Sequence, residues 1–206
     1  AYPKDKLSVV VVDNASTDGS PQMVRSRFAK VRLVESTENL GFAWANNVAV
    51  RQSTGDKVLL LNPDTEIVAG AIEKLSNFLN RNPGAAAVGP MLLDSRGSVY
   101  TSPEPAPTLL GELARLFHLD ILIPFARYPI DKWDINSDHK VEVLQGACLM
   151  LRREPLDQIG LLDEGYFMYS EEVDLCHRLL KSGWGIYWLP QAKVVHHGGQ
   201  SSSQAP

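Results

Sequence analysis

The chain has 206 residues, which is enough for one domain with a hydrophobic core and short for two. Its 20 basic and 24 acidic residues give a net charge of -4, which argues against a general nucleic-acid-binding protein, because such proteins usually carry a basic surplus. The two cysteines, Cys148 and Cys176, fit neither a disulfide framework nor a zinc site, and they favour a reducing compartment.

Strands and helices are expected to alternate through the first half of the chain. Residues 7–12 (LSVVVV) form an apolar, β-branched run, which predicts a strand buried on both faces of a sheet. Further strands are expected at 31–35, 57–61 and 85–93, and helices at 23–29, 43–52 and 68–80. This alternation predicts a βαβ series and an open α/β sheet.

The rhythm changes after Asp94. Residues 108–119 predict an amphipathic helix, and residues 121–140 show no clear period and predict a long loop. A strand is expected at 141–152, interrupted by Gly146 and Ala147. The remaining predicted elements are a helix at 171–182, short strands at 185–189 and 193–196, and a disordered tail at 201–206.

Two predicted strands are followed by aspartates, Asp13 and Asp64. In open α/β sheets, ligands bind at the carboxyl ends of the strands, so both positions are candidate binding residues. Asp13 opens a turn at 14–21 that is rich in hydrogen-bonding groups. An Asx turn leading into a helix capped by Ser20 explains that turn equally well, and both interpretations stay open.

A histidine pair distant in the sequence strengthens the hypothesis that Asp64 is a binding residue. On its own, Asn62-Pro63-Asp64 is also typical of a turn before a helix. His196 and His197 lie at the end of the last predicted strand, and a lone histidine there is usually structural. A carboxylate oxygen and an imidazole nitrogen together suit a divalent cation such as manganese, provided that the two side chains lie close in space.

Acidic residues crowd the first turn of the predicted helix at 171–182, namely Glu171, Glu172 and Asp174. The helix dipole alone explains them, at roughly 0.3–1 kcal/mol each, and Asp174 can pair with Arg178 four residues later. The apolar residues 167–169 directly precede them, however. Apolar surroundings raise the proton affinity of a carboxylate, which suits a general base.

Six segments, taken in chain order, resemble the inverting glycosyltransferases of family 2, and most closely their rhamnosyltransferase-like branch. The segments are VVVVDNASTDGS (9–20), ENLGFAWANN (38–47), LLLNPDTE (59–66), GACLMLRRE (146–154), GLLDEGYFMYSEEVDLCHRLLKSGW (160–184) and VVHHGGQS (194–201). The resemblance implies a GT-A fold, which is a Rossmann-like open mixed sheet with helices on both faces. It also implies a first strand before residue 7 that this chain is expected to lack.

The resemblance further implies one domain at 1–200, divided into a nucleotide-sugar-binding half at 1–93 and an acceptor and catalytic half at 94–200. It implies a nucleotide-diphosphate sugar donor and Mn²⁺ or Mg²⁺. Asp64 and His196 match the metal positions. The implied donor-binding residues are Asp13, Asn14, Ser16, Asp18, Asn39, Gly41, Asn47, Asn62 and Asp64, and the implied acceptor-side residues are Gly146, Ala147 and Asp174.

Glu172 matches the catalytic base, and Glu171 is the alternative. The family usually carries Glu-Asp where this chain has Glu171-Glu172, so the base is one methylene longer. A displacement of about 1 Å can cost on the order of 100-fold in rate. This departure keeps open a second hypothesis, a non-catalytic nucleotide-sugar-binding module in polysaccharide assembly. A nucleotidyltransferase is a weaker third, because its usual Gly-rich opening is not seen.

The same resemblance favours a dTDP-activated deoxysugar such as rhamnose as donor, with a UDP-sugar second, and a glycan or lipid-linked acceptor. It implies a cytoplasmic protein, with peripheral contact at the inner face of the membrane as an option, and no nucleic-acid partner. Residues 108–125 are apolar enough to touch a membrane. Packing of this segment over the acceptor side of the sheet is the favoured interpretation.

Overall fold

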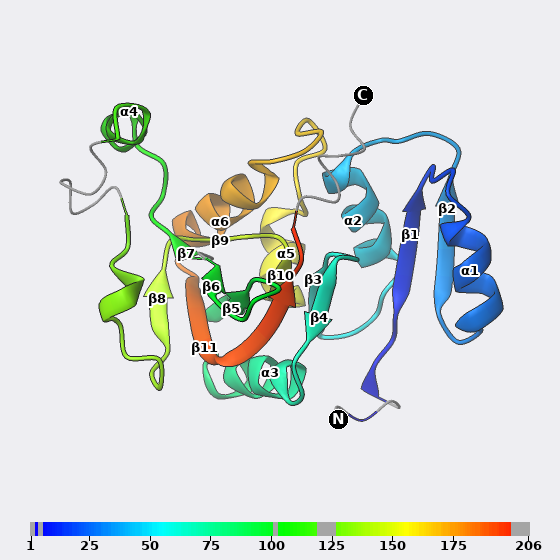
Figure 1. The fold of residues 1–206 in the computed structure, drawn as a ribbon, viewed down its shortest axis with the longest axis horizontal. Helices are drawn as coiled ribbons and strands as arrows, with labels where there is room; N and C mark the ends of the chain where they lie inside the picture. Colours follow the sequence, from blue (N-terminus) through cyan, green and yellow to red (C-terminus); the bar gives the residue numbers. More distant parts are fainter. Residues whose placement is uncertain (1–2, 4–5, 101–102, 119–126, 199–206) are drawn as a thin grey trace.

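The computed structural model describes residues 3, 6–100, 103–118 and 127–198 (Figure 1). The strands are β1 (Val10–Asn14), β2 (Arg32–Ser36), β3 (Lys57–Leu61), β4 (Thr65–Ile67), β5 (Ala85–Leu93), β6 (Val99–Tyr100), β7 (Pro103–Glu104), β8 (His139–Val141), β9 (Val143–Leu144), β10 (Cys148–Arg152) and β11 (Gly185–His196). The helices are α1 (Ser20–Arg27), α2 (Phe42–Arg51), α3 (Ala71–Arg81), α4 (Leu109–Leu116), α5 (Arg153–Ile159), α6 (Glu171–Lys181) and the 3₁₀ turn η2 (Ile130–Lys132).

The main sheet is mixed and has seven strands. Its order is β3-β10-β5-β11-β4, with β6 paired to β5 and β8 paired to β11. β10 runs antiparallel to both β3 and β5, whereas β11 runs parallel to β5. The expected open mixed sheet is therefore confirmed. β10 lies between β3 and β5 in the sheet but follows both in the chain, so its central position is not apparent from the order of the strands in the sequence.

Helices cover both faces of this sheet (Figure 1). Alternate residues of β10 serve the two faces: Leu149 and Leu151 join the core beneath α6, and Cys148 and Met150 join the core beneath α3. α3 turns an apolar face to the sheet, since Leu75, Phe78 and Leu79 are all buried there. Cys176 packs into the core as well. Both cysteines are core residues, and this burial raises the pKa of each thiol to about 12.

β1 and β2 form a separate parallel sheet, with α2 against β1 and α1 against β2 (Figure 1). The sequence predicts a strand buried on both faces at 7–12, but this is wrong for the residues described here. Val10, Val11 and Val12 are only half-buried, and Leu7 and Val9 are exposed. The reason is that β1 pairs with β2 alone among the described strands. The absence of a first strand stays a prediction.

Several element predictions need correction. Residues 65–67 do not lead into a helix at 68; they pair with the end of β11 as β4, and α3 begins only after the left-handed Gly70. β11 is one strand with a shifted register between Leu189 and Lys193, where two strands are expected. Pro190 explains the irregularity, because it has no N–H to donate. The expected loop at 121–140 contains η2 and the start of β8, and residues 121–126 lie outside the described part.

The second half of the chain contains α5, which is not predicted from the sequence. It also contains α4, which does not lie at the predicted position over the sheet. Within α4, only Gly111 and Ala114 are buried, while Leu109 is 81% and Leu116 is 70% exposed. Figure 1 places this helix at the periphery, away from the main sheet. The favoured packing over the sheet is therefore wrong for residues 109–116. No helix in the described ranges combines the length and apolarity needed to cross a bilayer. The predicted domain limits and the tail at 201–206 stay predictions.

Candidate active site

The end of β1 is tied to the start of α2 by one side chain, that of Asn14. Its Nδ2 donates to Asn39 Oδ1 at 2.8 Å and to the Gly41 carbonyl at 3.1 Å, and its Oδ1 accepts from Leu40 N–H at 3.0 Å. Asn39 Oδ1 also accepts from Gly41 N–H at 3.1 Å. Three of the residues expected to bind the donor, Asn14, Asn39 and Gly41, are thus joined in one loop cluster.

Asp13 is buried at the carboxyl end of β1, and its Oδ2 accepts from Ser16 N–H at 3.1 Å. Ala15 takes a left-handed backbone conformation within this turn. The Asx turn is therefore present, but the expected Ser20 cap is not. Ser20 is the first residue of α1, its N–H is bound by Asp18 Oδ1 at 2.9 Å, and Gly19 stands at the N-cap. Ser16 and Asp18 are exposed, and their contact with a donor stays a prediction.

Asp64 and His196 come together, although 132 positions separate them in the chain. β4 pairs with the end of β11 and sets His196 opposite Thr65. His196 Nε2 lies 3.4 Å from Asp64 Oδ1, and both side chains are largely buried. His197 turns instead to Glu66 Oε1 at 2.9 Å. The proximity that the metal hypothesis requires is thus present for His196.

The donor set of this pair fits a divalent cation. Asp64 Oδ1 is buried and has no hydrogen-bond partner among the described residues, although His196 Nε2 lies 3.4 Å away. A buried carboxylate oxygen without a hydrogen bond is costly. Within the described residues, no cluster of three or more His, Cys, Asp or Glu side chains is arranged to hold a metal. A cation at Asp64 and His196 would therefore complete its shell with water or with oxygens of a bound diphosphate. The metal role of both residues stays a prediction.

Asn62 connects this end of β3 to the predicted acceptor-side residues. Its N–H donates to the Ala147 carbonyl at 3.0 Å, just before β10 begins. A Cβ placed on the neighbouring Gly146 would lie 3.5 Å from the Phe42 ring and 4.0 Å from Glu172 Cβ. Gly146 therefore lies between the start of α2 and the start of α6.

Glu171 and Glu172 start α6 with two carboxyl groups that are partly withdrawn from water. Glu171 is 4% exposed, and the Oε2 atoms of both side chains are buried with no hydrogen-bond partner in the described part of the chain. Burial, together with the charge of Glu172, raises the pKa of Glu171 to about 7. Burial and the charge of Glu104 on β7 raise the pKa of Glu172 as well. Carboxyl groups with raised pKa values are suited to general base chemistry.

An exposed aromatic rim precedes these glutamates. Tyr166, Phe167 and Tyr169 are 39%, 54% and 64% exposed. The Phe167 carbonyl accepts from Phe42 N–H at 2.8 Å, so the rim touches the donor-side helix. Gly41 must be glycine here, because its φ is +90° and a Cβ would lie 2.5 Å from the Phe167 oxygen. The hydrogen bond between Phe42 and Phe167 joins the start of α2 to the segment that leads into α6.

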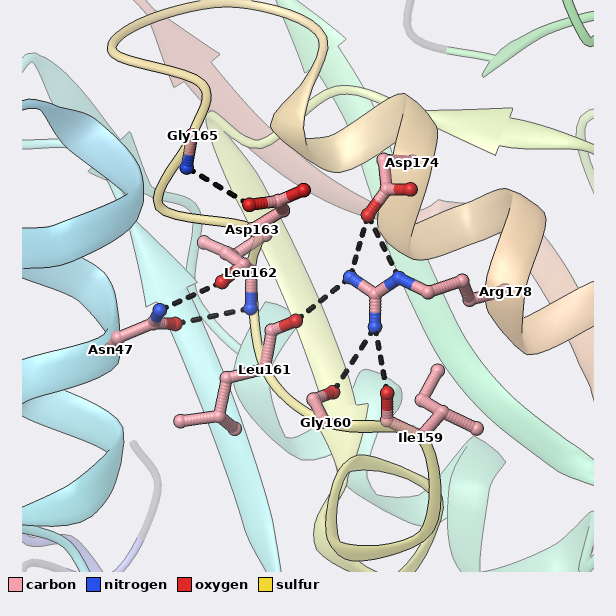
Figure 2. A network of polar contacts seen from close by, with 9 residues as sticks. All are labelled: Asn47, Ile159, Gly160, Leu161, Leu162, Asp163, Gly165, Asp174 and Arg178. Atoms are coloured by element: carbon pink, nitrogen blue, oxygen red, sulfur yellow. Dashed lines mark hydrogen bonds and ion pairs between the residues drawn. The ribbon is translucent and has the colours of Figure 1, made fainter.

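Two of the predicted site residues make a different kind of contact. Asn47 is 1% exposed, and its amide is bound by the Leu162 backbone and by Glu164. Figure 2 shows the contact of Asn47 with Leu162 and the binding of Asp174 by Arg178. Their direct contact with donor or acceptor stays a prediction. Sequence reasoning expects only a helix-surface pair for Arg178 and misses its three backbone carbonyl partners. No residue pattern signals such partners, because every residue carries a carbonyl.

The sequence matches the family described as Glycosyl transferase family 2 over residues 1–160. It is 36% identical over 219 residues to N-acetylglucosaminyl-diphospho-decaprenol L-rhamnosyltransferase of Mycobacterium tuberculosis, covering 97% of this chain and 69% of that protein. It is 26% identical over 197 residues to dTDP-rhamnosyl transferase RfbF of Shigella flexneri, covering 94% and 61%.

The fold has relatives among solved structures as well. The mannosyltransferase PcManGT from Pyrobaculum calidifontis, solved with GDP-Man and Mn²⁺, matches with a TM-score of 0.65 and 23% identity. The match covers 97% of this chain and 50% of that one, so the chain spans only part of the proteins that it resembles. At this identity the likeness establishes the fold. Together with the sequence match, it shows that the chain belongs to glycosyl transferase family 2, with the GT-A fold.

Proposed function

We propose that this protein transfers a sugar from a nucleotide-diphosphate donor to a hydroxyl group of a glycan or lipid-linked acceptor, with inversion at the anomeric carbon. The observation that carries the proposal is the position of Glu172. It starts α6 beside Gly146 and Phe42, and the neighbouring Ala147 is hydrogen-bonded to Asn62 just before Asp64. A candidate base, a donor-side helix and a candidate metal residue thus lie along one connected path.

The donor is assigned to the carboxyl ends of β1 and β3. Asp13 is placed at the nucleobase, and the cluster around Asn14 shapes the loop beside it. A dTDP-activated deoxysugar such as rhamnose is the preferred donor, supported by the Shigella relative, which is named a dTDP-rhamnosyl transferase, and a UDP-sugar is second. The solved mannosyltransferase carries GDP-Man, so nucleotide choice varies across the fold and must be measured.

Asp64 and His196 are the residues that would hold Mn²⁺ or Mg²⁺ near the diphosphate. When bound, such a cation supplies positive charge that stabilises the departing nucleotide diphosphate. The buried Asp64 Oδ1, which makes no hydrogen bond among the described residues and lies 3.4 Å from His196 Nε2, supports this assignment from within the chain. Its test is titration of the chain with Mn²⁺ by calorimetry, with Asp64→Ala expected to abolish the binding heat.

Glu172 is assigned as the base because it is less buried than Glu171 and faces Gly146. Its carboxylate takes the proton of the acceptor hydroxyl as the oxygen bonds to the anomeric carbon. The bond from that carbon to the diphosphate oxygen breaks on the opposite face, and its electron pair leaves with the nucleotide diphosphate. A single displacement of this kind inverts the anomeric configuration.

The acceptor proposal rests on the mycobacterial relative, whose name describes a diphospho-decaprenol-linked acceptor. A lipid-linked acceptor would bring the protein to a membrane surface, at its cytoplasmic face. The exposed leucines of α4 supply an apolar surface suited to such peripheral contact. This placement is proposed with the acceptor and is tested by sedimentation of the chain with anionic vesicles.

The deciding experiment follows product formation from dTDP-rhamnose, and separately from UDP-glucose, with decaprenyl-diphosphate-linked N-acetylglucosamine and Mn²⁺. Glu172→Gln should lower kcat by about 10²–10⁴-fold, since general base catalysis contributes that much. Glu73→Gln, at an exposed first-turn position of α3, is the matched control and should leave kcat unchanged. Full activity of the Glu172 variant would exclude it as the base.

A second candidate is a non-catalytic nucleotide-sugar-binding module. The observation in its favour is the glutamate at position 172, where the family usually has a shorter aspartate. Calorimetry with dTDP and UDP, combined with the transfer assay, separates the two functions. Binding of a nucleotide without any turnover would favour the module.

A further inference from the structure

The loop between α5 and α6, at residues 160–170, has no regular hydrogen-bonding pattern of its own, but side chains bind its backbone. The Arg178 guanidinium donates to the carbonyls of Ile159 at 3.0 Å and Leu161 at 2.8 Å, with a longer contact of 3.4 Å to Gly160 (Figure 2). Asp174 fixes the guanidinium from α6, at 2.8 Å from Nε and 2.7 Å from Nη2. This uses the planar donor fork that only arginine has.

Asn47 binds the next residue of the loop from the opposite side, from helix α2. Its Nδ2 donates to the Leu162 carbonyl at 2.8 Å, and its Oδ1 accepts from Leu162 N–H at 3.1 Å (Figure 2). Nδ2 also donates to Glu164 Oε1 at 2.8 Å, and Arg51 binds the same oxygen at 3.0 Å. Since buried backbone groups need partners, removing Asn47 would leave both polar groups of Leu162 unsatisfied.

These contacts join the two helices that carry the proposed site. Asn47 lies in α2, which begins at Phe42 on the donor side, and Arg178 lies in α6, which begins with the two glutamates. We call the contacts of Asn47 and Arg178 with residues 159–164, together with the Asp174–Arg178 ion pair, the loop clasp. The far end of the same loop is bound to α2 again, through the hydrogen bond from Phe42 N–H to the Phe167 carbonyl.

Between the loop clasp and the glutamates, the backbone is strained. Tyr169 and Ser170 both have positive φ values, of 69° and 70°, which non-glycine residues rarely adopt. Such residues cost on the order of 1–3 kcal/mol each and persist only where the surrounding structure holds them. Ser170 is followed directly by Glu171 and Glu172, so a loop that relaxed would move the first turn of α6.

We propose that Arg178 and Asn47 are positioning residues for the transfer step: through the loop clasp they hold Glu172 at a fixed place relative to Gly41 and Phe42 on the donor side. The inference rests on the proposed function, because it takes Glu172 as the base. Neither residue needs to touch a substrate. They act on the reaction by fixing the distance between the base, Glu172, and the donor side of the site.

The test uses Arg178→Lys, which keeps the charge but loses the planar fork, and Asn47→Asp, which replaces the Nδ2 donor by an acceptor. Arg81→Lys, at an exposed position in the last turn of α3, is the control. Arg178→Lys should lower kcat by about 10–100-fold, because a displacement near 1 Å can cost about 100-fold. The KM for dTDP-rhamnose should stay within about twofold, and amide hydrogen exchange at 160–165 should accelerate.

A purely structural role predicts something else: a lower Tm with kcat per folded molecule unchanged. The double variant sharpens the contrast. If both residues act through one loop, its loss in kcat should approach that of the more damaging single variant, not the product of the two losses. Multiplicative losses, or a native kcat in Arg178→Lys, would overturn the inference.

The proposed function can fail separately. If Glu172→Gln transfers the sugar as fast as the native chain, the base assignment falls and the positioning role falls with it, even if exchange at 160–165 still reports the loop clasp. If Glu172→Gln is inactive while both clasp variants keep native kcat, the base stands and only the positioning inference is wrong.

Discussion

Replacing Glu171 by glutamine should stabilise the protein at alkaline pH and not at acidic pH. Burial raises the pKa of Glu171 from its ordinary value of 4.5 to about 7. The folded chain therefore holds this proton up to higher pH than the unfolded chain does. By linkage, the free energy of unfolding falls as pH rises from about 4.5 through about 7. At 1.36 kcal/mol per pKa unit, the native chain loses about 2–3 kcal/mol between pH 5 and pH 8.

The Glu171→Gln variant has no proton to lose at this position, so it should escape that loss. Urea unfolding at pH 5, 6, 7 and 8 measures the difference. The variant should differ little from the native chain at pH 5 and should be more stable by about 2–3 kcal/mol at pH 8. Glu73→Gln, at an exposed position, should follow the native curve. A constant difference between Glu171→Gln and the native chain at all four values would refute the reasoning.

Three further predictions concern the site and the surface. In a pH–rate profile, the rate of transfer should rise with pH, and the midpoint of that rise should lie above pH 4.5, because burial raises the pKa of Glu172 above its ordinary value. A midpoint at or below pH 4.5 would contradict this. Asn14→Ala should weaken dTDP binding in calorimetry by about tenfold, because it removes hydrogen bonds worth roughly 1 kcal/mol each from the loop at 39–41, and unchanged affinity would argue against that loop. Leu109→Ser with Leu116→Ser should leave Tm within about 1 °C, since both side chains are exposed, and should lower the bound fraction on anionic vesicles; equal binding would remove α4 from the membrane proposal.

Local patterns account for the parts of the fold and site that the sequence predicts well. β5 occupies the expected residues, 85–93, because this run (AAAVGPMLL) has no charged or hydrogen-bonding side chain, and its residues are buried on both faces of the sheet up to Leu92. The helix at 171–182 and its acidic first turn are likewise a local pattern, and α6 spans Glu171–Lys181. Predictions of this kind succeed because the signal lies within one turn or one strand.

The parts that fail depend on distant partners. Nothing in the residues of β10 states that it pairs with both β3 and β5. α5 has only seven residues, too few for a period to stand out. The prediction that α4 packs over the sheet assumes that its apolar face is covered by another part of the chain, and its leucines are exposed instead. The contacts of Arg178 are invisible for the same reason, since their acceptors are backbone carbonyls 17 to 19 positions away.

Glu171 links the stability argument to the function. A glutamate that is 4% exposed, with an unpartnered oxygen, costs stability above its pKa, and glutamine would fill nearly the same space without that cost. Retaining such a group is expected where activity needs it, because perturbed ionisable groups cluster at functional sites. Glu171→Gln should therefore gain stability at pH 8 and lose kcat in the transfer assay, while binding dTDP as the native chain does. A variant that gains stability and keeps its native kcat would show that the buried carboxyl serves neither the base nor its position.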